Sequence, residues 1–422
     1  MDEKFAALEN YSFWDGRTPE LGFIREDYLC KIDKFVSQRL VKVLTGQRRA
    51  GKSYILRQIA SRIISSGVSS DNIFFLNKEY LAFDFVVDYR DLEELFREYL
   101  KRRSPQGKVY IFIDEIQDID GWEKFVNSYS QDYTIECEIF VSGSNSRMLS
   151  AELSTLLTGR YVEFRVFPFS FGEYSSSLGI QTGRQSYLDY MQSGGLPELL
   201  RISGAEARMQ YVDGVKNTII LKDIVQRHSV RDAALLEELF AYLVNNSSSL
   251  VSVQNIVNYL SSRGRKTTYD TVSQYVGYLS EAFMIHKVER FDLKGKEILS
   301  GTAKYYANDP AYHNFLYGGY GHGAGYMLEN IVCLELLRKG YKVYVGAKNG
   351  REVDFVAELS DRKIYIQVAY MLVDEDVIKR EYAPLQAIDD NYEKFVVSLD
   401  DIAFPSRGGI RNVQAWNLSA VL

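Results

Sequence analysis

Cysteine and histidine are scarce in this sequence. Its 422 residues include three cysteines and four histidines, and neither type shows the spacing of a zinc site or of a disulfide framework. We therefore interpret the cysteines as small core residues and the histidines as structural ones. These residues are Cys30, Cys137 and Cys333, and His228, His286, His313 and His322.

Long apolar runs and an excess of basic residues are also missing. No stretch approaches the roughly 20 apolar residues needed to span a bilayer, and the first ten residues are polar and acidic where a signal peptide would be basic and then apolar. We expect a cytoplasmic protein with no membrane partner. A net charge of −6 argues against strong non-specific DNA binding by the whole chain. A local basic patch could still bind DNA.

What the sequence does contain is typical of a folded multidomain protein. Hydrophobic residues make up 46% and charged residues 25%, and the length predicts two to four domains. Short β-rich runs alternate with amphipathic stretches from about residue 40, which predicts an α/β fold with a parallel sheet. The expected strands are 40–44, 73–76, 109–113, 135–141 and 162–166, and the expected helices between them are 53–65 and 92–101.

The sequence pattern changes twice in the second half of the chain. Residues 186–225 read as mainly helical, broken at the Gly-Gly-Leu-Pro stretch 194–197, and look like a lid. Residues 231–292 show three helical periods and then the apolar run 284–288, the pattern of a winged helix. A smaller α/β segment follows, with a helix at 327–339 and strands at 342–345, 353–358 and 364–368.

A phosphate-binding loop directly follows the first expected strand. The segment GQRRAGKS fits the GxxxxGK[ST] pattern in the strand, loop and helix context that it requires. Its glycines let backbone N–H groups turn toward phosphates, Lys52 would reach the β- and γ-phosphates, and Ser53 would bind Mg²⁺. The predicted ATP-binding residues are Gly46, Gln47, Arg48, Arg49, Ala50, Gly51, Lys52, Ser53 and Tyr54.

Two acidic residues end the strand expected at 109–113. We predict that Asp114 holds Mg²⁺ and that Glu115 is the general base that polarises the attacking water. Ser144 and Asn145 follow another strand and could contact the γ-phosphate or orient water, although a simple turn explains them equally well. Arg160 could add positive charge in the transition state, from its own chain or from a neighbouring copy, or be a surface arginine.

Several motifs together resemble one family. They are GQRRAGKS, IFIDEIQDIDGWEKF from Ile111, VSGSNSRMLS from Val141, TGRYVEFRVFPFSFGEY from Thr158 and GGLPE from Gly194. Nearly the whole chain resembles prokaryotic AAA+ ATPases of the archaeal-type group, which carry a C-terminal domain of unknown function. The resemblance implies a P-loop core (1–180), a helical lid (181–228), a winged helix (229–296) and a restriction-endonuclease-like domain (297–422). It also implies Walker roles for Lys52, Ser53, Asp114 and Glu115.

The nuclease-like domain looks degenerate. Enzymes of that type hold Mg²⁺ with an acid on a helix, an acid on a strand and an acid-x-Lys element on the next strand. Glu329 and Asp354 fit the first two positions, but Gln367 and Ala369 stand at the third. A displaced Lys363 on the same strand face as Gln367 is conceivable. We therefore expect binding or scaffolding here rather than nuclease activity.

Three hypotheses follow. The first is a Mg²⁺-dependent ATPase in which ATP acts as a switch, with an unknown protein partner and with assembly into a homo-oligomer left open. The second is a DNA-binding protein that uses the basic segment 263–269 of the winged helix, for which packing or partner binding is an equal alternative. The third is a metal-dependent nuclease regulated by ATP.

Overall fold

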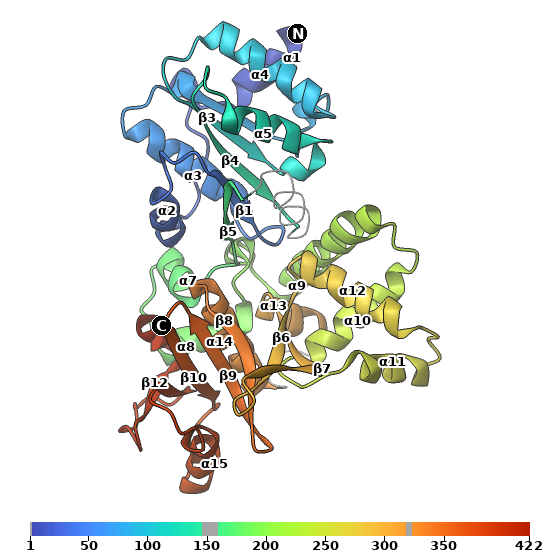
Figure 1. The fold of residues 1–422 in the computed structure, drawn as a ribbon, viewed down its shortest axis with the longest axis vertical. Coiled ribbons are helices and arrows are strands. Elements are labelled where there is room, and N and C mark those ends of the chain that lie inside the picture. The colour runs from blue at the N-terminus through green and yellow to red at the C-terminus, as the bar shows by residue number, and fades with distance from the viewer. Residues whose placement is uncertain (1, 146–158, 318–322) are drawn as a thin grey trace. The chain divides into compact units, whose positions relative to one another are not determined.

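The computed structural model describes residues 2–145, 159–317 and 323–422. The chain divides into two compact units, Met1–Val166 and Phe167–Leu422, called here the first and the second unit (Figure 1). The first unit ends before the core boundary expected at residue 180. The reason is packing, since Phe171 and Tyr174 belong to a hydrophobic core with Tyr187 and other residues of the second unit.

The first unit is built from five strands and their connecting helices. Its elements are α1 (Asp2–Tyr11), α2 (Glu26–Asp33), β1 (Val41–Thr45), α3 (Lys52–Ser65), η1 (Ser70–Asn72), β2 (Ile73–Asn77), η2 (Leu81–Phe83), α4 (Tyr89–Arg103), β3 (Val109–Asp114), η3 (Ile116–Asp118), α5 (Trp122–Gln131), β4 (Cys137–Gly143) and β5 (Tyr161–Arg165).

The five strands form one parallel sheet in the order β2-β3-β4-β1-β5. The predicted parallel sheet is therefore confirmed, and the observed strand ends differ from the expected ones by one or two residues. β3, β4 and β1 are neighbouring parallel strands, so their carboxyl ends lie at the same edge of the sheet. That edge carries the predicted phosphate site.

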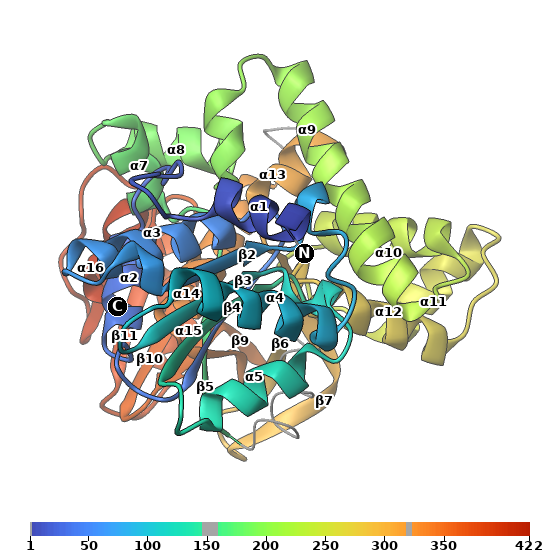
Figure 2. The same ribbon diagram turned by 90° about the horizontal axis from the view of Figure 1, so that it is seen from above.

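Helices cover both faces of this sheet, as Figures 1 and 2 show. Side chains alternate between the faces along each strand. On β1, Val43 packs in a core with α1, α4 and α5, whereas Leu44 packs in another core with α2 and α3. β1 to β4 are thus buried on both faces, which explains their mostly apolar sequences, whereas the edge strand β5 is only partly buried.

The second unit combines helices with a larger sheet. Its elements are α7 (Phe171–Leu178), α8 (Arg184–Ser193), η5 (Pro197–Arg201), α9 (Ala205–Thr218), η6 (Ile219–Gln226), α10 (Ala233–Asn245), α11 (Val253–Ser262), α12 (Tyr269–Glu281), β6 (Ile285–Asp292), β7 (Glu297–Ala307), α13 (Pro310–Tyr312), η7 (His313–Tyr317), α14 (Ala324–Lys339), β8 (Lys342–Lys348), β9 (Arg351–Leu359), β10 (Arg362–Val368), α15 (Glu375–Gln386), β11 (Glu393–Ser398), β12 (Ile410–Gln414), η8 (Ala415–Asn417) and α16 (Leu418–Val421).

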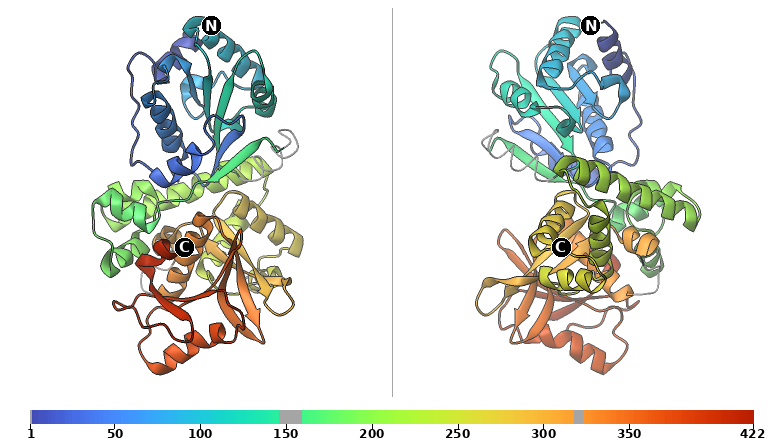
Figure 3. Two further views of the ribbon diagram at one scale, coloured as in Figure 1. Left: turned by 60° about the vertical axis from the view of Figure 1, so that its left-hand side comes forward. Right: turned by 90° about the vertical axis from the view of Figure 1, so that its right-hand side faces the viewer.

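The sheet of the second unit has seven strands in the order β12-β11-β10-β9-β8-β6-β7, and Figure 3 shows it in yellow-orange to red from two sides. The expected domain boundary at 296/297 is wrong, because it falls between the two strands of the β6–β7 hairpin. That hairpin joins the sheet through parallel pairing of β6 with β8. Core residues of α14 pack on one face of the sheet and core residues of α15 on the other.

Residues 181–228 are helical as predicted, and α10, α11 and α12 lie where the three winged-helix helices were expected (Figure 2). The roles of lid and winged helix stay predictions. The break at 194–197 is confirmed, since α8 ends at Ser193 and η5 begins at Pro197. Gly194 has a φ of 77°, and a Cβ there would lie 2.1 Å from Oδ1 of Asp309, so that no larger residue fits.

Among the helices that the structure describes, none is long and apolar enough to cross a membrane.

Candidate nucleotide site

The loop between β1 and α3 has the backbone of a phosphate cradle. Gly46 has a φ of 147°, and a Cβ at this position would lie 2.2 Å from the carbonyl oxygen of Val166, so glycine is required. Arg49 and Gly51 also have positive φ angles, 65° and 99°. Gly51 is the N-cap of α3 and offers no capping side chain. The first N–H groups of this 14-residue helix thus follow the loop, where an anion is favoured.

Lys52 is buried inside this loop. Its Nζ donates to the carbonyl oxygens of Gly46 at 3.0 Å and Gln47 at 3.2 Å, and it lies 3.5 Å from Oε1 of Glu115. The ammonium is therefore held by two backbone carbonyl groups of the loop and by the carboxylate of Glu115. A phosphate group could replace these contacts, because a full negative charge attracts the ammonium more strongly than a carbonyl oxygen does.

Asp114 lies at the end of β3 with its carboxylate oriented from three sides. Asn77 at the end of β2 donates to Oδ2 at 2.9 Å, and the hydroxyl of Ser142 on β4 donates to Oδ1. Burial and the neighbouring charge of Glu115 raise the pKa of Asp114 to about 6, and hydrogen bonds from Ser142 and Ser53 oppose that rise. The two predicted Mg²⁺ ligands, Ser53 and Asp114, are thus brought together. Carboxylate and hydroxyl oxygens are the kind of ligand that Mg²⁺ prefers.

Glu115 has a strained backbone and a charged side chain. Its φ and ψ are 52° and 50°, a left-handed conformation that is uncommon for residues other than glycine. Burial favours the neutral form, but the charges of Lys52 and Arg48 outweigh burial and lower the pKa of Glu115. The side-chain amide of Gln117 also donates to it. A general base must be ionised and oriented, and Glu115 is both.

Residues 38–175 match the sequence pattern of an AAA domain, and residues 184–319 match a domain of unknown function, DUF8612. An uncharacterised protein of Haemophilus influenzae is 35% identical over 378 residues, which are 89% of this chain and 92% of that protein. The chain belongs to the family of that protein. The uncharacterised protein MJ1544 of Methanocaldococcus jannaschii is 29% identical over 384 residues, 86% of this chain and 83% of that protein. Among solved structures, the Walker-type ATPase PABY2304 of Pyrococcus abyssi shares 16% identity at a TM-score of 0.46, covering 72% of this chain and 99% of that one.

The other predicted residues of the AAA domain differ in their positions. Ser144 and Asn145 are buried just after β4, beside β1 and near the loop, as expected, while their chemical roles stay predictions. The ring of Tyr54 packs against Gly22 and Arg57. His322 and the motif residues 146–158 lie outside the described residues.

Arg160 is exposed and lies away from the phosphate site of its own chain. Its carbonyl oxygen accepts a hydrogen bond from the N–H of Val41 at 3.0 Å, so Arg160 lies at the amino end of the parallel strands β1 and β5. The phosphate loop follows β1 at the other end, and a five-residue strand is roughly 16 Å long. Of the three alternatives, this position disfavours action within the chain, and the exposure of Arg160 is compatible with a surface arginine. Its action on a neighbouring copy stays a prediction.

Sequence reasoning missed several residues that orient the site. Asn77 could have been found, because it is a polar residue that ends an apolar strand, and it pairs in register with Asp114. Arg25 gave no signal, since it lies well upstream of the loop. It is almost fully buried, and its Nη1 donates to the carbonyl oxygen of Ala50 at 2.8 Å. Arg25 thus fixes the outer side of the phosphate loop.

The predicted nuclease-like residues meet an unexpected lysine. Nζ of Lys304 on β7 lies 2.9 Å from Glu329 on α14, and 2.6 Å and 3.6 Å from Glu352 and Asp354 on β9. Gln367 on β10 lies apart from that ammonium, and its side-chain oxygen accepts from the backbone N–H of Asp354 at 3.4 Å. The lysine of this cluster is therefore Lys304, supplied by a different strand.

The suggestion of a displaced Lys363 is wrong. Its ammonium pairs with Glu358 at 3.0 Å and lies 5.1 Å from the ring centre of Phe291, so it has partners elsewhere on the sheet. Within the described residues, no group of three or more His, Cys, Asp or Glu side chains is arranged to hold a metal ion. The ammonium of Lys304 occupies the position between the acids.

Lys304, Glu329, Glu352 and Asp354 form a second cluster, in which the lysine is ion-paired with the acids. Lys304 is 2% exposed. Its burial lowers its pKa, but the carboxylates of Glu329, Asp354 and Glu352 more than compensate, so the lysine stays charged. Burial, followed by the nearby charge of Glu329, raises the pKa of Asp354 to about 8.

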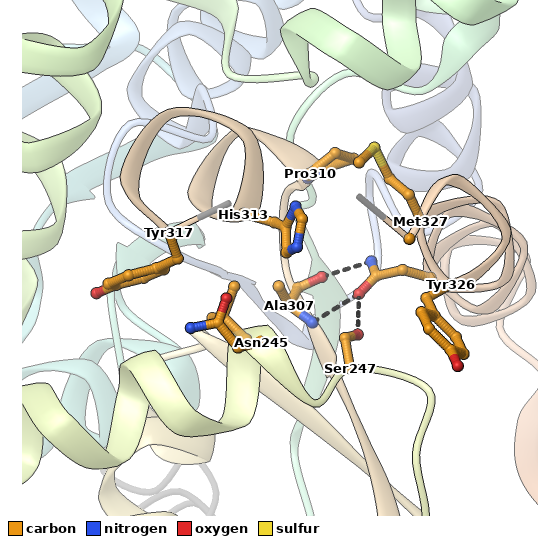
Figure 4. A pocket seen from close by; sticks show the side chains of 11 residues that line it. Asn245, Ser247, Ala307, Pro310, His313, Tyr317, Tyr326 and Met327 are labelled. Carbon is orange, nitrogen blue, oxygen red and sulfur yellow. Dashed lines mark hydrogen bonds between the residues drawn. The ribbon is translucent and has the colours of Figure 1, made fainter. Parts of the chain in front are cut away.

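A pocket of about 470 Å³ lies elsewhere in the second unit, between α10, η7 and α14 (Figure 4). Asn330 on α14 lines this pocket, and its side-chain amide bonds to two neighbouring segments. It accepts from the N–H of Ala307 and the hydroxyl of Ser247, and it donates to the carbonyl oxygen of Ala307. Asn330 thus ties α14 to β7 and to the turn after α10, which is a structural task.

The basic segment before α12 is partly neutralised. The guanidinium of Arg265 lies 3.0 Å from the carboxylate of Glu238 and 3.6 Å from that of Asp232. Tyr269, at the start of α12, is about half exposed. An arginine paired in this way contributes less positive potential to a DNA backbone than its sequence context indicates.

Proposed function

We propose that this protein binds ATP with Mg²⁺ and hydrolyses it, and that the nucleotide state acts as a switch on the second unit. The observation that carries the proposal is the meeting of Lys52, Ser53, Asp114 and Glu115 at one edge of the parallel sheet. Two segments that lie far apart in the sequence, the start of α3 and the end of β3, supply these residues. Their convergence has the chemical logic of phosphoryl transfer, in which positioning and electrostatics do most of the catalysis.

Each side chain has a definable task. Backbone N–H groups of the loop and the ammonium of Lys52 would bind the phosphates, with Lys52 leaving the carbonyl oxygens of Gly46 and Gln47. Asp114 and Ser53 would hold Mg²⁺, which supplies charge neutralisation on the phosphate oxygens when bound. Glu115, already ionised, would orient and deprotonate the attacking water.

The Glu115→Gln variant tests the hydrolysis proposal. Glutamine keeps the size and one hydrogen-bond acceptor but cannot take a proton, so fluorescent ATP analogues should bind with unchanged affinity while turnover falls by about 100-fold or more. The exposed Glu94 on α4 provides the matched control, and Glu94→Gln should hydrolyse ATP like the wild type.

Two results would contradict this proposal in different ways. Binding of ATP without any turnover in the wild type would leave a nucleotide sensor rather than an ATPase. Turnover that persists in Glu115→Gln would show that another group, or a contaminating enzyme, activates the water.

For the second unit we propose binding or scaffolding rather than nuclease activity, because Lys304 already neutralises the acids that a metal would need. DNA binding through α12 stays a prediction. It requires salt-sensitive binding that Lys266→Ala weakens, with Arg265→Ala expected to have the smaller effect because Arg265 is already ion-paired.

A further inference from the structure

The phosphate loop carries a second buried cation besides Lys52. Arg48 is the third residue of the loop, and it is only 9% exposed. Its Nη1 forms an ion pair with Oε1 of Glu79, a residue two positions after the end of β2. A buried guanidinium inside a phosphate loop calls for an explanation, because a loop of this type needs only one lysine to bind a triphosphate.

The charge of Arg48 acts on the reacting edge of the site. It is one of the two cations that lower the pKa of Glu115, together with Lys52. Lys52 lies 3.5 Å from this carboxylate, and Arg48 belongs to the same phosphate loop, four residues before Lys52. The attacking water and the γ-phosphate have to lie next to that carboxylate if Glu115 is the base.

Glu79, one partner of Arg48, has a partly solvated side chain. The side chain of Glu79 is 46% exposed, so water can replace Arg48 in this ion pair at little cost. The backbone of Glu79 is held separately, since its N–H donates to Oδ1 of Asn77 at 2.9 Å. Arg48 can thus release this half-exposed carboxylate in exchange for a phosphate.

We infer that Arg48 is a catalytic residue that leaves Glu79 when a nucleoside triphosphate binds and contacts the γ-phosphate. A planar guanidinium can donate two parallel hydrogen bonds to phosphate oxygens. It would stabilise the charge that develops there in the transition state, the task for which Arg160 is on the wrong edge of the sheet. The inference rests on the proposed ATPase function and adds an arginine supplied by the same chain.

The experiment compares Arg48→Gln and Glu79→Gln for steady-state turnover and for the affinities of fluorescent ATP and ADP analogues. We expect Arg48→Gln to lower kcat by about tenfold to 100-fold and to weaken ATP binding while ADP affinity stays within about twofold, because ADP lacks the γ-phosphate. Arg48→Lys should recover part of the loss. Arg39, an exposed arginine before β1, is the matched control, and Arg39→Gln should behave as wild type.

Glu79→Gln separates catalysis from structure. If Arg48 acts on the phosphate, Glu79→Gln should keep kcat and bind ATP at least as tightly as the wild type. If the pair only braces the loop, both variants should lose ATP and ADP affinity alike, which would overturn the inference. Normal turnover in Arg48→Gln would also overturn it while leaving the ATPase proposal intact. A wild type that neither binds nor hydrolyses ATP would instead refute the proposed function itself.

Discussion

Two buried clusters of this protein are made from the same residue types and behave differently. In the first unit, Lys52 donates to two backbone carbonyl oxygens and lies 3.5 Å from Glu115. In the second unit, Nζ of Lys304 lies within 3.6 Å of three carboxylates, two of them at 2.9 Å or less. Lys52 is thus held by two carbonyl dipoles and one carboxylate, whereas Lys304 lies among three acidic side chains.

That difference decides what each lysine can do. The ammonium of Lys52 is stabilised when it exchanges two carbonyl oxygens for a charged phosphate oxygen. The carbonyl groups of the loop lose little free energy in this exchange. The ammonium of Lys304 lies between the buried side chains of Glu329 and Asp354 and the partly exposed Glu352, and removing it would leave buried acids without a cation. The first cluster can therefore accept an anion. In the second cluster, the ammonium of Lys304 stands where a bound metal ion would otherwise lie.

The largest effect should come from removing the lysine of the second cluster. Lys304→Met leaves Glu329, Glu352 and Asp354 without a cation, and breaking a buried ion pair in this way costs about 3 to 5 kcal/mol. Lys52→Met should cost less, because Glu115 keeps its hydrogen bond from Gln117 and the nearby charge of Arg48. Hydrogen exchange followed by mass spectrometry measures the stability of each unit separately.

Partial rescue provides the control for this stability test. Adding Glu329→Gln to Lys304→Met removes one uncompensated charge and should recover part of the lost free energy of unfolding. Equal losses for Lys304→Met and Lys52→Met would show that the two lysines are structurally equivalent and would break the comparison.

Activity should show the reverse order. Lys52→Met removes a charge that stabilises the transition state, so kcat should fall by about 100-fold or more, measured as phosphate release from ATP. Lys304→Met should keep turnover within about twofold per folded molecule, because none of its contacts belongs to the phosphate site. A large loss in Lys304→Met below its unfolding temperature would mean that the second cluster is coupled to hydrolysis.

The phosphate site could be predicted from the sequence because its information is local. The loop, Lys52 and Ser53 are consecutive, and Asp114 and Glu115 end a continuous apolar strand, so a motif and a strand pattern suffice. The position of Arg160 depends on strand order, which the motif does not contain. Parallel pairing of β1 with β5 places it at the amino edge, opposite the loop.

The second cluster could not be predicted, because its lysine comes from another part of the fold. Sequence reasoning sought a lysine near Gln367, on the strand where a nuclease would carry it. Lys304 lies on β7, which the expected boundary at 296/297 separated from its own hairpin partner β6. Only the extension of the sheet through β6 and β7 brings Lys304 to Glu329 and Asp354, and that extension is a long-range pairing.

The smallest effect concerns the pH dependence of stability. Burial raises the pKa of Asp354 to about 8 and that of Asp114 to about 6, whereas an unfolded aspartate titrates near 4. A raised pKa means that the folded state binds a proton which the unfolded state releases. The resulting stability is complete below about pH 4 and is lost as the pH rises to the folded pKa.

The window between pH 7 and pH 8 therefore separates the two clusters. Asp114 is mostly ionised there, while Asp354 still releases its proton, so the contribution of Asp354 to the free energy of unfolding should fall by about 1 kcal/mol per pH unit. Urea unfolding at pH 7, 7.5 and 8 measures this slope, which Asp354→Asn should reduce and Asp114→Asn should leave nearly unchanged. An equal reduction in both variants would show that the clusters titrate alike, and that the three carboxylates around Lys304 do not distinguish them.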